Sequence, residues 1–239
     1  MYKNDDISID KIRIVLNEEF MKLGEQIGEG SYGKIYKVNY TKENKIYVAK
    51  VVEIDLEEKI LLDFTKREID ILYQSKCENL VKLIFYKIFK NGFLIIMEYA
   101  DKGNLHRIVD GKKLSENQFF SIFKEIFFGV KYLHRNLIEH RDLKLENILV
   151  NSKNIIKICD FGLAYKLETL INDKGSVYNK EQVRYSKAAT LGSPQCLSPE
   201  AIEQKSAPFG SVDIWSLGCI AYFLVFGFYP FQNSKVNLI

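Results

Sequence analysis

The stretch HRDLKLENILV at residues 140–150 constrains this chain more than any other part of the sequence. It places Asp142, Lys144 and Asn147 in a fixed order, and Asp160 follows further along in CDFGLA. Two carboxylates, one amide oxygen and one ammonium group can together hold Mg²⁺ and neutralise a triphosphate. A fold that brings these four side chains together would therefore form a site for a cation and for phosphate groups.

A second stretch, IGEGSYGKIYKVNY at residues 27–40, carries the pattern G-x-G-x-x-G at Gly28, Gly30 and Gly33. Two unrelated phosphate-binding devices use this pattern. In the dinucleotide fingerprint the glycines end a strand and open a helix, whereas in protein kinases they form a loop that covers ATP. The pattern alone is weak, since most matches to it are ordinary turns.

The segments that follow the glycines decide between the two devices. Residues 34–40 alternate as in a strand, residues 41–46 are a polar turn, and residues 47–54 are rich in β-branched side chains. The glycines therefore lie between two strands of a hairpin, and no helix follows them. This context excludes a nicotinamide-dependent oxidoreductase, which would also need an acidic residue after a βαβ unit.

The rest of the first half predicts a small sheet with one helix. Apolar residues recur at helical spacing among charges over residues 56–75, which predicts a helix. Residues 80–89 and 92–100 predict two further strands around a turn at Asn91 and Gly92.

The second half is mainly helical. Ser115 and Gln118 predict a capping box at the start of a helix whose apolar residues, from Phe119 to Leu133, share one face. Residues 166–189 are polar and lack periodicity, which predicts a long mobile loop. Residues 214–231 lack charge over a length at the lower limit of a membrane span. Their glycines, their proline and the lack of a basic anchor favour a buried helix instead.

The H-R-D-L-x-x-x-N and D-F-G signatures resemble those of eukaryotic protein kinases. The resemblance runs from about Phe20 to the end of the sequence and implies an α+β, bilobal protein-kinase-like fold. The N-lobe would be an antiparallel sheet plus one helix, and the mainly helical C-lobe would lack its last helices. The implied divisions are an N-terminal extension at 1–19, an N-lobe with hinge at 20–101, and a C-lobe at 102–239 that contains an activation segment at 160–200.

The resemblance also implies catalytic roles. Asp142 would orient the attacking hydroxyl and accept its proton, and Lys144 would stabilise the transferring γ-phosphoryl group. Ser193 would steady Asp142 and Lys144. Lys50 would hold the α- and β-phosphates of ATP, with Glu68 as its ion-pair partner.

The nucleotide and its metal are assigned in the same way. Asn147 and Asp160 would bind Mg²⁺. The implied contacts of ATP are Ile27, Gly28, Glu29, Gly30, Gly33, Ile35, Val48, Lys50, Glu98, Ala100 and Leu149. Among these, Ile35, Val48 and Leu149 would sandwich adenine. The apolar stack that links the two lobes of active kinases would consist of Leu72, Leu83, His140 and Phe161.

The implied activity is transfer of the γ-phosphoryl group of Mg·ATP to serine or threonine in protein substrates, because a lysine at position 144 marks Ser/Thr kinases. Arg141 precedes Asp142 and in the family commonly needs a phosphate on the activation segment to neutralise it. Thr190 and Ser186 are the candidate acceptors for an activating kinase. The motifs look most like those of the calmodulin-dependent and autophagy-initiating branches, and Glu146 resembles a position that favours basic residues before the target.

The sequence departs from the family pattern in three places. One departure, at Cys196, leaves the substrate preference open, and the other two favour a second interpretation. Val48 stands where the family nearly always has alanine, and Cys196 replaces an aromatic residue of the substrate-docking turn. The sequence also ends soon after the central helix that begins at Asp213, without the arginine that usually pairs with Glu200. The chain is then a fragment, a protein covered by another subunit or a degenerate kinase, and we favour a truncated gene product. The alternative function is a pseudokinase-like module that binds ATP without transferring phosphate.

The composition limits the classes of protein to which the chain can belong. The 239 residues are 47% hydrophobic and carry a net charge of +3, which suits a soluble globular protein and is too weak for nucleic-acid binding. The four cysteines include no C-x-x-C pair, which indicates a reducing compartment and no zinc site. With no secretory signal, we expect a cytoplasmic location, with a nuclear one as the alternative, and no membrane span.

Overall fold

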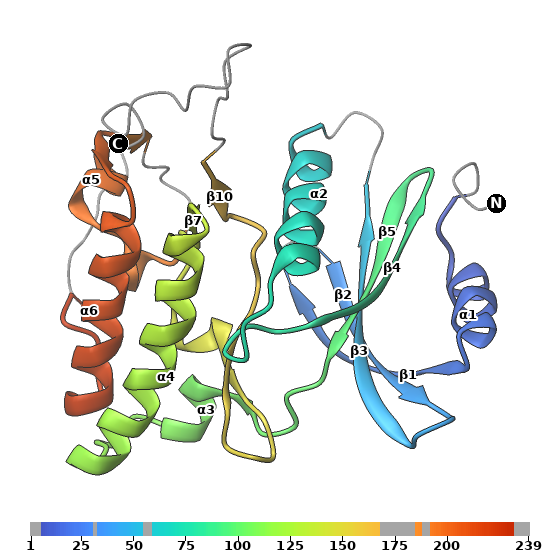
Figure 1. Cartoon of the computed structure of the whole chain (residues 1–239), viewed down its shortest axis with the longest axis horizontal. Helices are drawn as coiled ribbons and strands as arrows, with labels where there is room; N and C mark the ends of the chain where they lie inside the picture. Colours follow the sequence, from blue (N-terminus) through green and yellow to red (C-terminus); the bar gives the residue numbers. More distant parts are fainter. Residues whose placement is uncertain (1–5, 31–32, 55–58, 168–184, 188–191, 232–239) are drawn as a thin grey trace. The chain divides into compact units, whose positions relative to one another are not determined.

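The computed structural model describes residues 6–30, 33–54, 59–167, 185–187 and 192–231. The chain divides into two compact units, whose elements are labelled in Figure 1. The N-terminal unit comprises Met1–Lys76 and Val81–Ala100, and the C-terminal unit comprises Cys77–Leu80 and Asp101–Ile239.

A five-stranded antiparallel sheet in the order β1-β2-β3-β5-β4 forms the frame of the N-terminal unit. The strands are β1 (Met21–Gly30), β2 (Gly33–Tyr40), β3 (Lys45–Glu53), β4 (Leu83–Phe89) and β5 (Gly92–Glu98). The four strands predicted over 34–40, 47–54, 80–89 and 92–100 are present, but residues 80–82 and 99–100 lie outside them. Strand β3 begins at Lys45, inside the turn predicted over 41–46, and the turn before β5 lies at Lys90 and Asn91.

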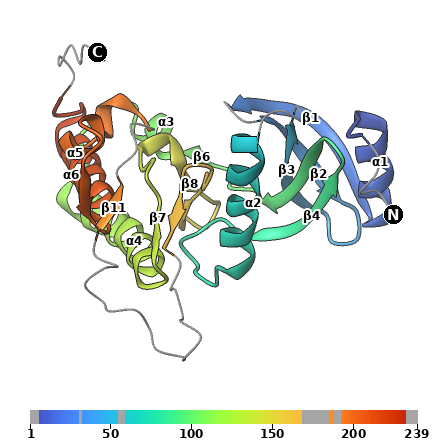
Figure 2. The same ribbon diagram turned by 90° about the horizontal axis from the view of Figure 1, so that it is seen from above.

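Two helices lie on opposite sides of this sheet. Helix α2 (Lys59–Gln74) is the helix predicted over 56–75, and its Glu68 is bonded to Lys50 of β3. Helix α1 (Ile9–Glu18) lies on the other side (Figure 1), and Figure 2 shows the same arrangement from above. Helix α1 belongs to the segment predicted only as an N-terminal extension, so the unit has one helix more than the sequence analysis predicted.

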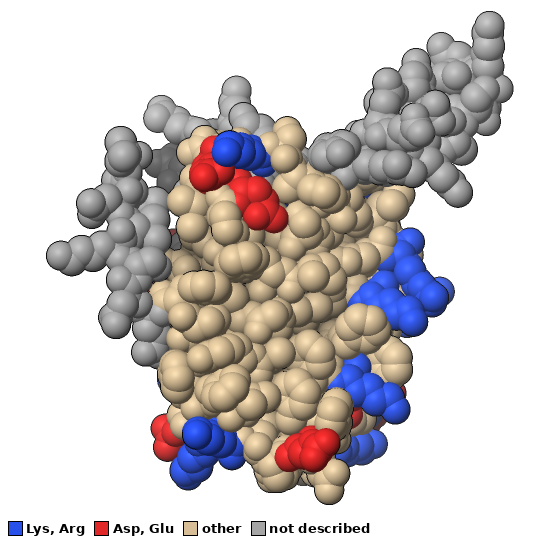
Figure 3. Space-filling view, turned by 90° about the vertical axis from the view of Figure 1, so that its left-hand side faces the viewer, with Lys and Arg blue, Asp and Glu red and all other residues tan. Residues whose placement is uncertain are grey.

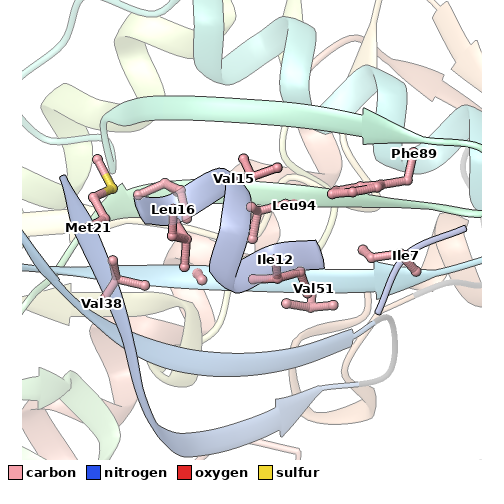
Figure 4. Close-up of a cluster of buried hydrophobic side chains, with 11 residues drawn as sticks. Ile7, Ile12, Val15, Leu16, Met21, Val38, Val51, Phe89 and Leu94 are labelled. Carbon is pink, nitrogen blue, oxygen red and sulfur yellow. The ribbon is translucent and has the colours of Figure 1, made fainter. Parts of the chain in front are cut away.

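Helix α1 begins at a polar cap and buries one face. The Ser8 side chain accepts a hydrogen bond from the Lys11 amide, which satisfies one of the first helical N–H groups. Ile12, Val15 and Leu16 recur at helical spacing and are almost fully buried. They pack against sheet residues that include Met21, Val38, Ala49, Val51, Phe89, Leu94 and Ile96, most of which are labelled in Figure 4.

Both ends of α1 are fastened to turns of the sheet. Before the helix, the Ile7 amide donates to Asn91 Oδ1 at 2.6 Å. After the helix, the Phe20 carbonyl accepts hydrogen bonds from the Thr41 amide and hydroxyl, each at 2.9 Å. The Lys42 ammonium lies 3.4 Å from the centre of the Phe20 ring, a cation–π contact. Helix α1 is therefore an integral layer of the N-terminal unit.

The C-terminal unit contains the long helices α4 (Glu116–Arg135) and α6 (Ser211–Phe226) and the short helices α3 (Leu105–Val109) and α5 (Pro199–Ile202). Helix α4 begins at the predicted capping box, in which Ser115 and Gln118 bond to each other's backbone. The stripe that α4 buries consists of Ile126, Gly129, Val130 and Leu133.

Short strand pairs hold the segments between these helices. One sheet joins β6 (Gly103–Asn104), β8 (Ile148–Val150) and β9 (Ile156–Ile158). Strand β7 (Ile138–Glu139) pairs with β10 (Tyr165–Lys166), and β11 (Tyr185–Lys187) pairs with β12 (Ser206–Pro208).

The predicted loop over 166–189 is wrong at Lys166 and at residues 185–187, which lie in strands. These strands pair with segments distant in sequence, so local periodicity did not reveal them. Residues 168–184 and 188–189 lie outside the described part of the chain.

Helix α6 is apolar on nearly every side. It begins after Gly210 and ends at Gly227, both at φ 84°, a left-handed conformation that favours glycine. The predicted burial holds for one side only, since Ile214 is 56% exposed and Phe226 is 43% exposed. Figure 3 shows a face of the C-terminal unit on which uncharged residues predominate. Within the described residues, no helix combines the length and the apolarity that crossing a membrane requires.

Candidate active site

A buried ion pair anchors the site residues of the N-terminal unit. Lys50 Nζ lies 2.8 Å and 2.7 Å from the two carboxylate oxygens of Glu68, as the predicted ion pair requires. Only 10% of the lysine side chain and 4% of the glutamate side chain are exposed. Removing one partner of such a pair costs about 3–5 kcal/mol, because the other charge stays buried. The ammonium group is thereby held at one place on the sheet.

Gly28 and Gly30 lie in β1, a strand that the sequence analysis did not predict, and Gly33 opens β2. The two strands pair as a hairpin, and no helix follows the glycines, as predicted. Gly28 is opposite Ile35, and Gly30 is opposite Gly33. A Cβ at Gly33 would lie 2.5 Å from the Val51 carbonyl oxygen, so β2 approaches β3 more closely there than any side chain permits. At Gly28 the nearest atom would be 3.8 Å away, which is ordinary contact. Gly33 is thus the glycine that the backbone strictly requires.

The face of the sheet that carries Lys50 also carries two predicted adenine contacts. Ile35 is directly opposite Lys50 in the ladder, and Val48 is two residues before it, so all three point to one side. Val48 is half-buried and opposite Met97 of β5.

The remaining predicted contacts of ATP fall on both units. Ile27 and Glu29 are exposed on β1, Glu98 Oε1 accepts the Lys82 amide at 2.8 Å, and Ala100 is buried. Leu149 lies on β8 in the C-terminal unit, so its sandwich with Ile35 and Val48 stays a prediction.

The Asp142 carboxylate is the centre of the site in the C-terminal unit. Oδ1 accepts hydrogen bonds from the Ser193 amide at 3.0 Å and from the Ser193 hydroxyl at 3.1 Å. Oδ2 accepts from Asn147 Nδ2 at 3.0 Å and lies 2.8 Å from Lys144 Nζ. Four donors therefore fix both carboxylate oxygens, and the fold brings together four side chains that the sequence analysis selected.

Lys144 is held in its charged form. Burial acts to lower the pKa of Lys144, but the hydrogen bond to Asp142 and the charges of Asp142, Asp160 and Glu146 outweigh it and raise the pKa overall. The result is a fixed positive charge beside the Asp142 carboxylate, where an anionic phosphoryl group could be stabilised.

Asn147 and Asp160 are linked through the backbone. The Cys159 amide donates to the Asn147 carbonyl at 3.0 Å, which places Asp160 directly after the bonded residue. Asn147 Nδ2 donates to the Asp142 carbonyl at 2.8 Å, so its Oδ1 is the atom that can face a cation. Asp160 has φ 64°, a left-handed conformation that costs about 1–3 kcal/mol in most residues. An amide oxygen and a carboxylate are the hard ligands that Mg²⁺ prefers, so these residues fit the predicted metal.

His140 ties the two catalytic segments together. Its Nδ1 accepts the Asp142 amide at 3.3 Å, and its Nε2 donates to the Cys159 carbonyl at 3.0 Å, as in the neutral imidazole. Its ring lies 5.2 Å from that of Phe161, and neither residue is exposed. His140 is therefore a packed positioning residue, and the apolar stack that it would form with Leu72 and Leu83 stays a prediction. Leu72 and Leu83, the other two members of that stack, lie in the N-terminal unit.

Asp213, at the start of α6, holds the backbone that precedes Asp142. Its Oδ2 accepts from the His140 amide at 2.8 Å and from His134 Nε2 at 2.7 Å, and its Oδ1 accepts from the Arg141 amide at 2.8 Å. Complete burial acts to raise the pKa of Asp213, but the His134 hydrogen bond and the Arg141 amide help to lower it overall. The sequence analysis placed Asp213 only at the start of the helix, since no local pattern indicated these bonds.

One residue of this region escaped the sequence analysis altogether. Glu139 is completely buried and binds the Arg141 guanidinium. A carboxylate between Ile138 and His140 resembles an ordinary surface acid, so the sequence contains no signal for this pair.

Comparison with known families agrees with this geometry. The family model described as "Protein kinase domain" matches residues 21–239. The chain belongs to the protein kinase family. The predicted bilobal protein-kinase-like fold is confirmed with it.

Named relatives of this kinase come from animals and plants. The chain is 33% identical over 223 residues to NUAK family SNF1-like kinase 1 of Homo sapiens, and the aligned region covers 91% of this chain and 31% of that protein. The chain is also 33% identical over 220 residues to CBL-interacting serine/threonine-protein kinase 17 of Arabidopsis thaliana, and the aligned region covers 91% of this chain and 48% of that protein. The chain thus spans a third to a half of the length of these relatives, and its branch within the family stays a prediction.

Proposed function

We propose that this kinase chain transfers the γ-phosphoryl group of ATP to serine or threonine hydroxyls of protein substrates. The observation that carries the proposal is the Asp142 carboxylate, fixed by Ser193, Asn147 and Lys144. A carboxylate held this firmly, beside a lysine and an amide oxygen, can orient a hydroxyl and neutralise charge on a phosphoryl group. Lys144 and the Ser/Thr kinase named above support the choice of serine and threonine as acceptors.

The cofactor in this proposal is Mg·ATP. Asn147 and Asp160 would hold the metal, Lys50 would hold the α- and β-phosphates, and the hairpin around Gly33 would cover them. When bound, Mg·ATP supplies the phosphoryl group and neutralises part of its charge.

Each residue around the Asp142 carboxylate has its own role in this reaction. Asp142 orients the substrate hydroxyl and accepts its proton at the carboxylate. Lys144 remains charged beside it and stabilises the oxygens of the group in transfer. Ser193 and Asn147 keep the Asp142 carboxylate in one orientation, so little reorganisation is needed during the reaction.

Substrate choice, regulation and location belong to the same proposal. Glu146 supports a preference for basic residues near the target. Thr190 lies outside the described residues, and Ser186 lies on β11, so both stay candidates for an activating kinase. The four free cysteines support a cytoplasmic location, since reducing compartments keep thiols unpaired.

Val48 favours the second candidate function, a pseudokinase-like module. It lies on the same face as Lys50 and brings two more methyl groups than alanine to the predicted adenine site. Crowding there would lower affinity for ATP. Such a module would bind protein partners and transfer no phosphate.

The two functions differ in one assay. The purified chain is incubated with Mg²⁺, γ-labelled ATP and a basic peptide that contains both serine and threonine. We expect label on those residues, and a loss of about 10²–10⁴-fold in the Asp142→Asn variant. Asp70→Asn, an exposed change on α2, is the matched control and should retain activity.

Equal labelling by the wild type and by Asp142→Asn would contradict the proposal, because the transfer would then come from a contaminating kinase. Binding of Mg·ATP by the wild type without any transfer would establish the pseudokinase-like alternative.

A further inference from the structure

The arginine that precedes Asp142 is already paired within the fold. Arg141 Nε and Nη2 both donate to Glu139 Oε2, at 3.0 Å and 2.9 Å. Only 12% of the arginine side chain is exposed, and none of the glutamate side chain. Charge-assisted hydrogen bonds of this kind are among the strongest polar contacts in proteins. The guanidinium charge is therefore neutralised by a carboxylate two residues away in the same chain.

The second oxygen of Glu139 reaches the start of α6. Glu139 Oε1 accepts the Gly210 amide at 2.6 Å, and Gly210 caps that helix. The N-terminus of a helix favours a negative charge, so the carboxylate is stabilised from this side as well. A Cβ at Gly210 would lie 2.9 Å from the His134 ring, so the backbone here packs closely against that ring. Glu139 thus connects the Arg141 side chain to the helix that also carries Asp213.

The segment that follows Asp160 also contacts the guanidinium. Tyr165 of β10 is directly opposite Glu139 of β7, and the Leu167 amide donates to the Leu137 carbonyl at 2.8 Å. The Arg141 guanidinium lies 4.2 Å from the centre of the Tyr165 ring, a cation–π contact. The arginine therefore contacts both a carboxylate and an aromatic ring.

This pairing matters for Asp142 because Arg141 has a strained backbone. Its φ is 65°, in the left-handed region that costs a residue with a side chain about 1–3 kcal/mol. Such a conformation persists only where its surroundings hold it, here the bond from its amide to Asp213 and the bonds from its side chain to Glu139. Asp142 is the next residue, so a relaxation of Arg141 would turn the catalytic carboxylate away from Ser193 and Asn147.

We propose that Glu139 is a positioning residue for phosphoryl transfer, and that it keeps the catalytic loop in its working geometry without a phosphate on the activation segment. The proposal rests on the proposed kinase function. A phosphate that competed for Arg141 would leave the Glu139 carboxylate buried without its partner, which is strongly unfavourable. Phosphorylation at Thr190 or Ser186 is then not needed to neutralise Arg141.

The test compares phosphate-free forms of the whole chain. Phosphatase-treated wild type, Glu139→Gln and Glu139→Asp are checked by mass and assayed with Mg·ATP and the basic peptide. We expect the wild type to be active and Glu139→Gln to lose about 10- to 100-fold in kcat, with the KM for ATP changed less than about twofold. Glu139→Asp keeps the charge and should recover most of the activity. Glu203→Gln, an exposed change in a surface ion pair, is the matched control.

A phosphate-free wild type that becomes active only after phosphorylation would overturn the proposal, and so would an unchanged kcat in Glu139→Gln. If Glu139→Gln does not fold, the double variant Glu139→Gln/Arg141→Met removes both charges of the pair and takes its place. A folded double variant with wild-type kcat would also overturn the proposal.

Amide hydrogen exchange at residues 140–142, measured on the same samples, separates this proposal from the proposed function. Faster exchange in Glu139→Gln than in the wild type supports the positioning role even if neither protein transfers phosphate. In that case only the proposed function fails. Identical exchange in the two proteins would overturn the positioning role.

Discussion

At the residue scale, the site in the C-terminal unit depends on carboxylates that are fixed by several donors each. Asp142 has four donors, and Asp213 has three. Carboxylates satisfied in this way are rigid acceptors. The geometry of the catalytic loop is therefore tied to the ionisation of the buried Asp213.

This dependence predicts an acid-sensitive stability. The pKa of Asp213 is lowered from its ordinary value of 3.8 in the folded chain. Its contribution to stability is therefore complete above that value and is lost as the pH falls through the folded pKa. We expect Asp213→Asn to lower the free energy of unfolding by about 2 kcal/mol at pH 7. The difference from wild type should narrow below about pH 4.

Urea denaturation at a series of pH values measures this difference. Asp10→Asn is the control, since the Asp10 side chain is 88% exposed. A difference between Asp213→Asn and wild type that stays constant down to pH 3 would contradict the assignment.

A second prediction at this scale concerns the glycine hairpin. Gly33→Ala would force a methyl group to within 2.5 Å of the Val51 carbonyl oxygen, whereas Gly28→Ala meets only the Ile35 side chain at 3.8 Å. We expect the first change to cost about 1–3 kcal/mol of stability and to weaken ATP binding, and the second to do much less. Thermal melts and nucleotide titrations of the two variants check this, and equal effects would show that the close approach is unimportant.

Residues with a fixed motif spacing could be predicted from the sequence, and residues defined by tertiary contacts could not. Asp142, Asn147 and Asp160 are recognisable because their chemistry requires these residue types in this order. Glu139 has no such pattern, since its burial depends on where Arg141 and the start of α6 lie. Lys50 could likewise be predicted from its spacing to the glycines. The hydrogen bonds of Asp213 could not, because they depend on tertiary contacts.

At the element scale, the main finding is that α1 covers the side of the sheet that does not carry Lys50. Side chains alternate along β3, so Ala49 and Val51 contact the α1 cluster while Lys50 points to α2. The sequence does contain a signal for α1, namely Ser8 as a cap followed by Ile12, Val15 and Leu16 at helical spacing. Its amphipathic pattern shows a helix, but it does not show the surface on which that helix packs.

If α1 is an integral layer, its buried face contributes to stability. Leu16 is completely buried, so Leu16→Ala should cost about 2–5 kcal/mol. Ile14, on the same helix, is 50% exposed, and Ile14→Ala should change stability by less than about 0.5 kcal/mol. Urea denaturation of both variants measures the contrast. Similar small effects would mean that α1 is dispensable for the N-terminal unit.

At the scale of the whole molecule, the predicted ATP contacts and catalytic residues are divided between the two units. Lys50, Glu68 and the glycine hairpin belong to the N-terminal unit, and Asp142, Asn147 and Asp160 belong to the C-terminal unit. The α6 region also presents exposed apolar side chains and lines a hollow of about 750 Å³ with Trp215 and Phe231 among its residues. The central claim of the proposed function is that residues of both units bind one Mg·ATP.

Calorimetric titration of Mg·ATP into the chain tests this claim most directly. The wild type is compared with Lys50→Met, a change in the N-terminal unit, and with Asp160→Asn, a change in the C-terminal unit, while Lys34→Met provides an exposed control on β2. We expect one binding site for Mg·ATP per chain. Both site variants should lower the affinity at least about tenfold, and the control should leave it unchanged. Binding that only one of the site variants weakens, or that neither of them does, would contradict it.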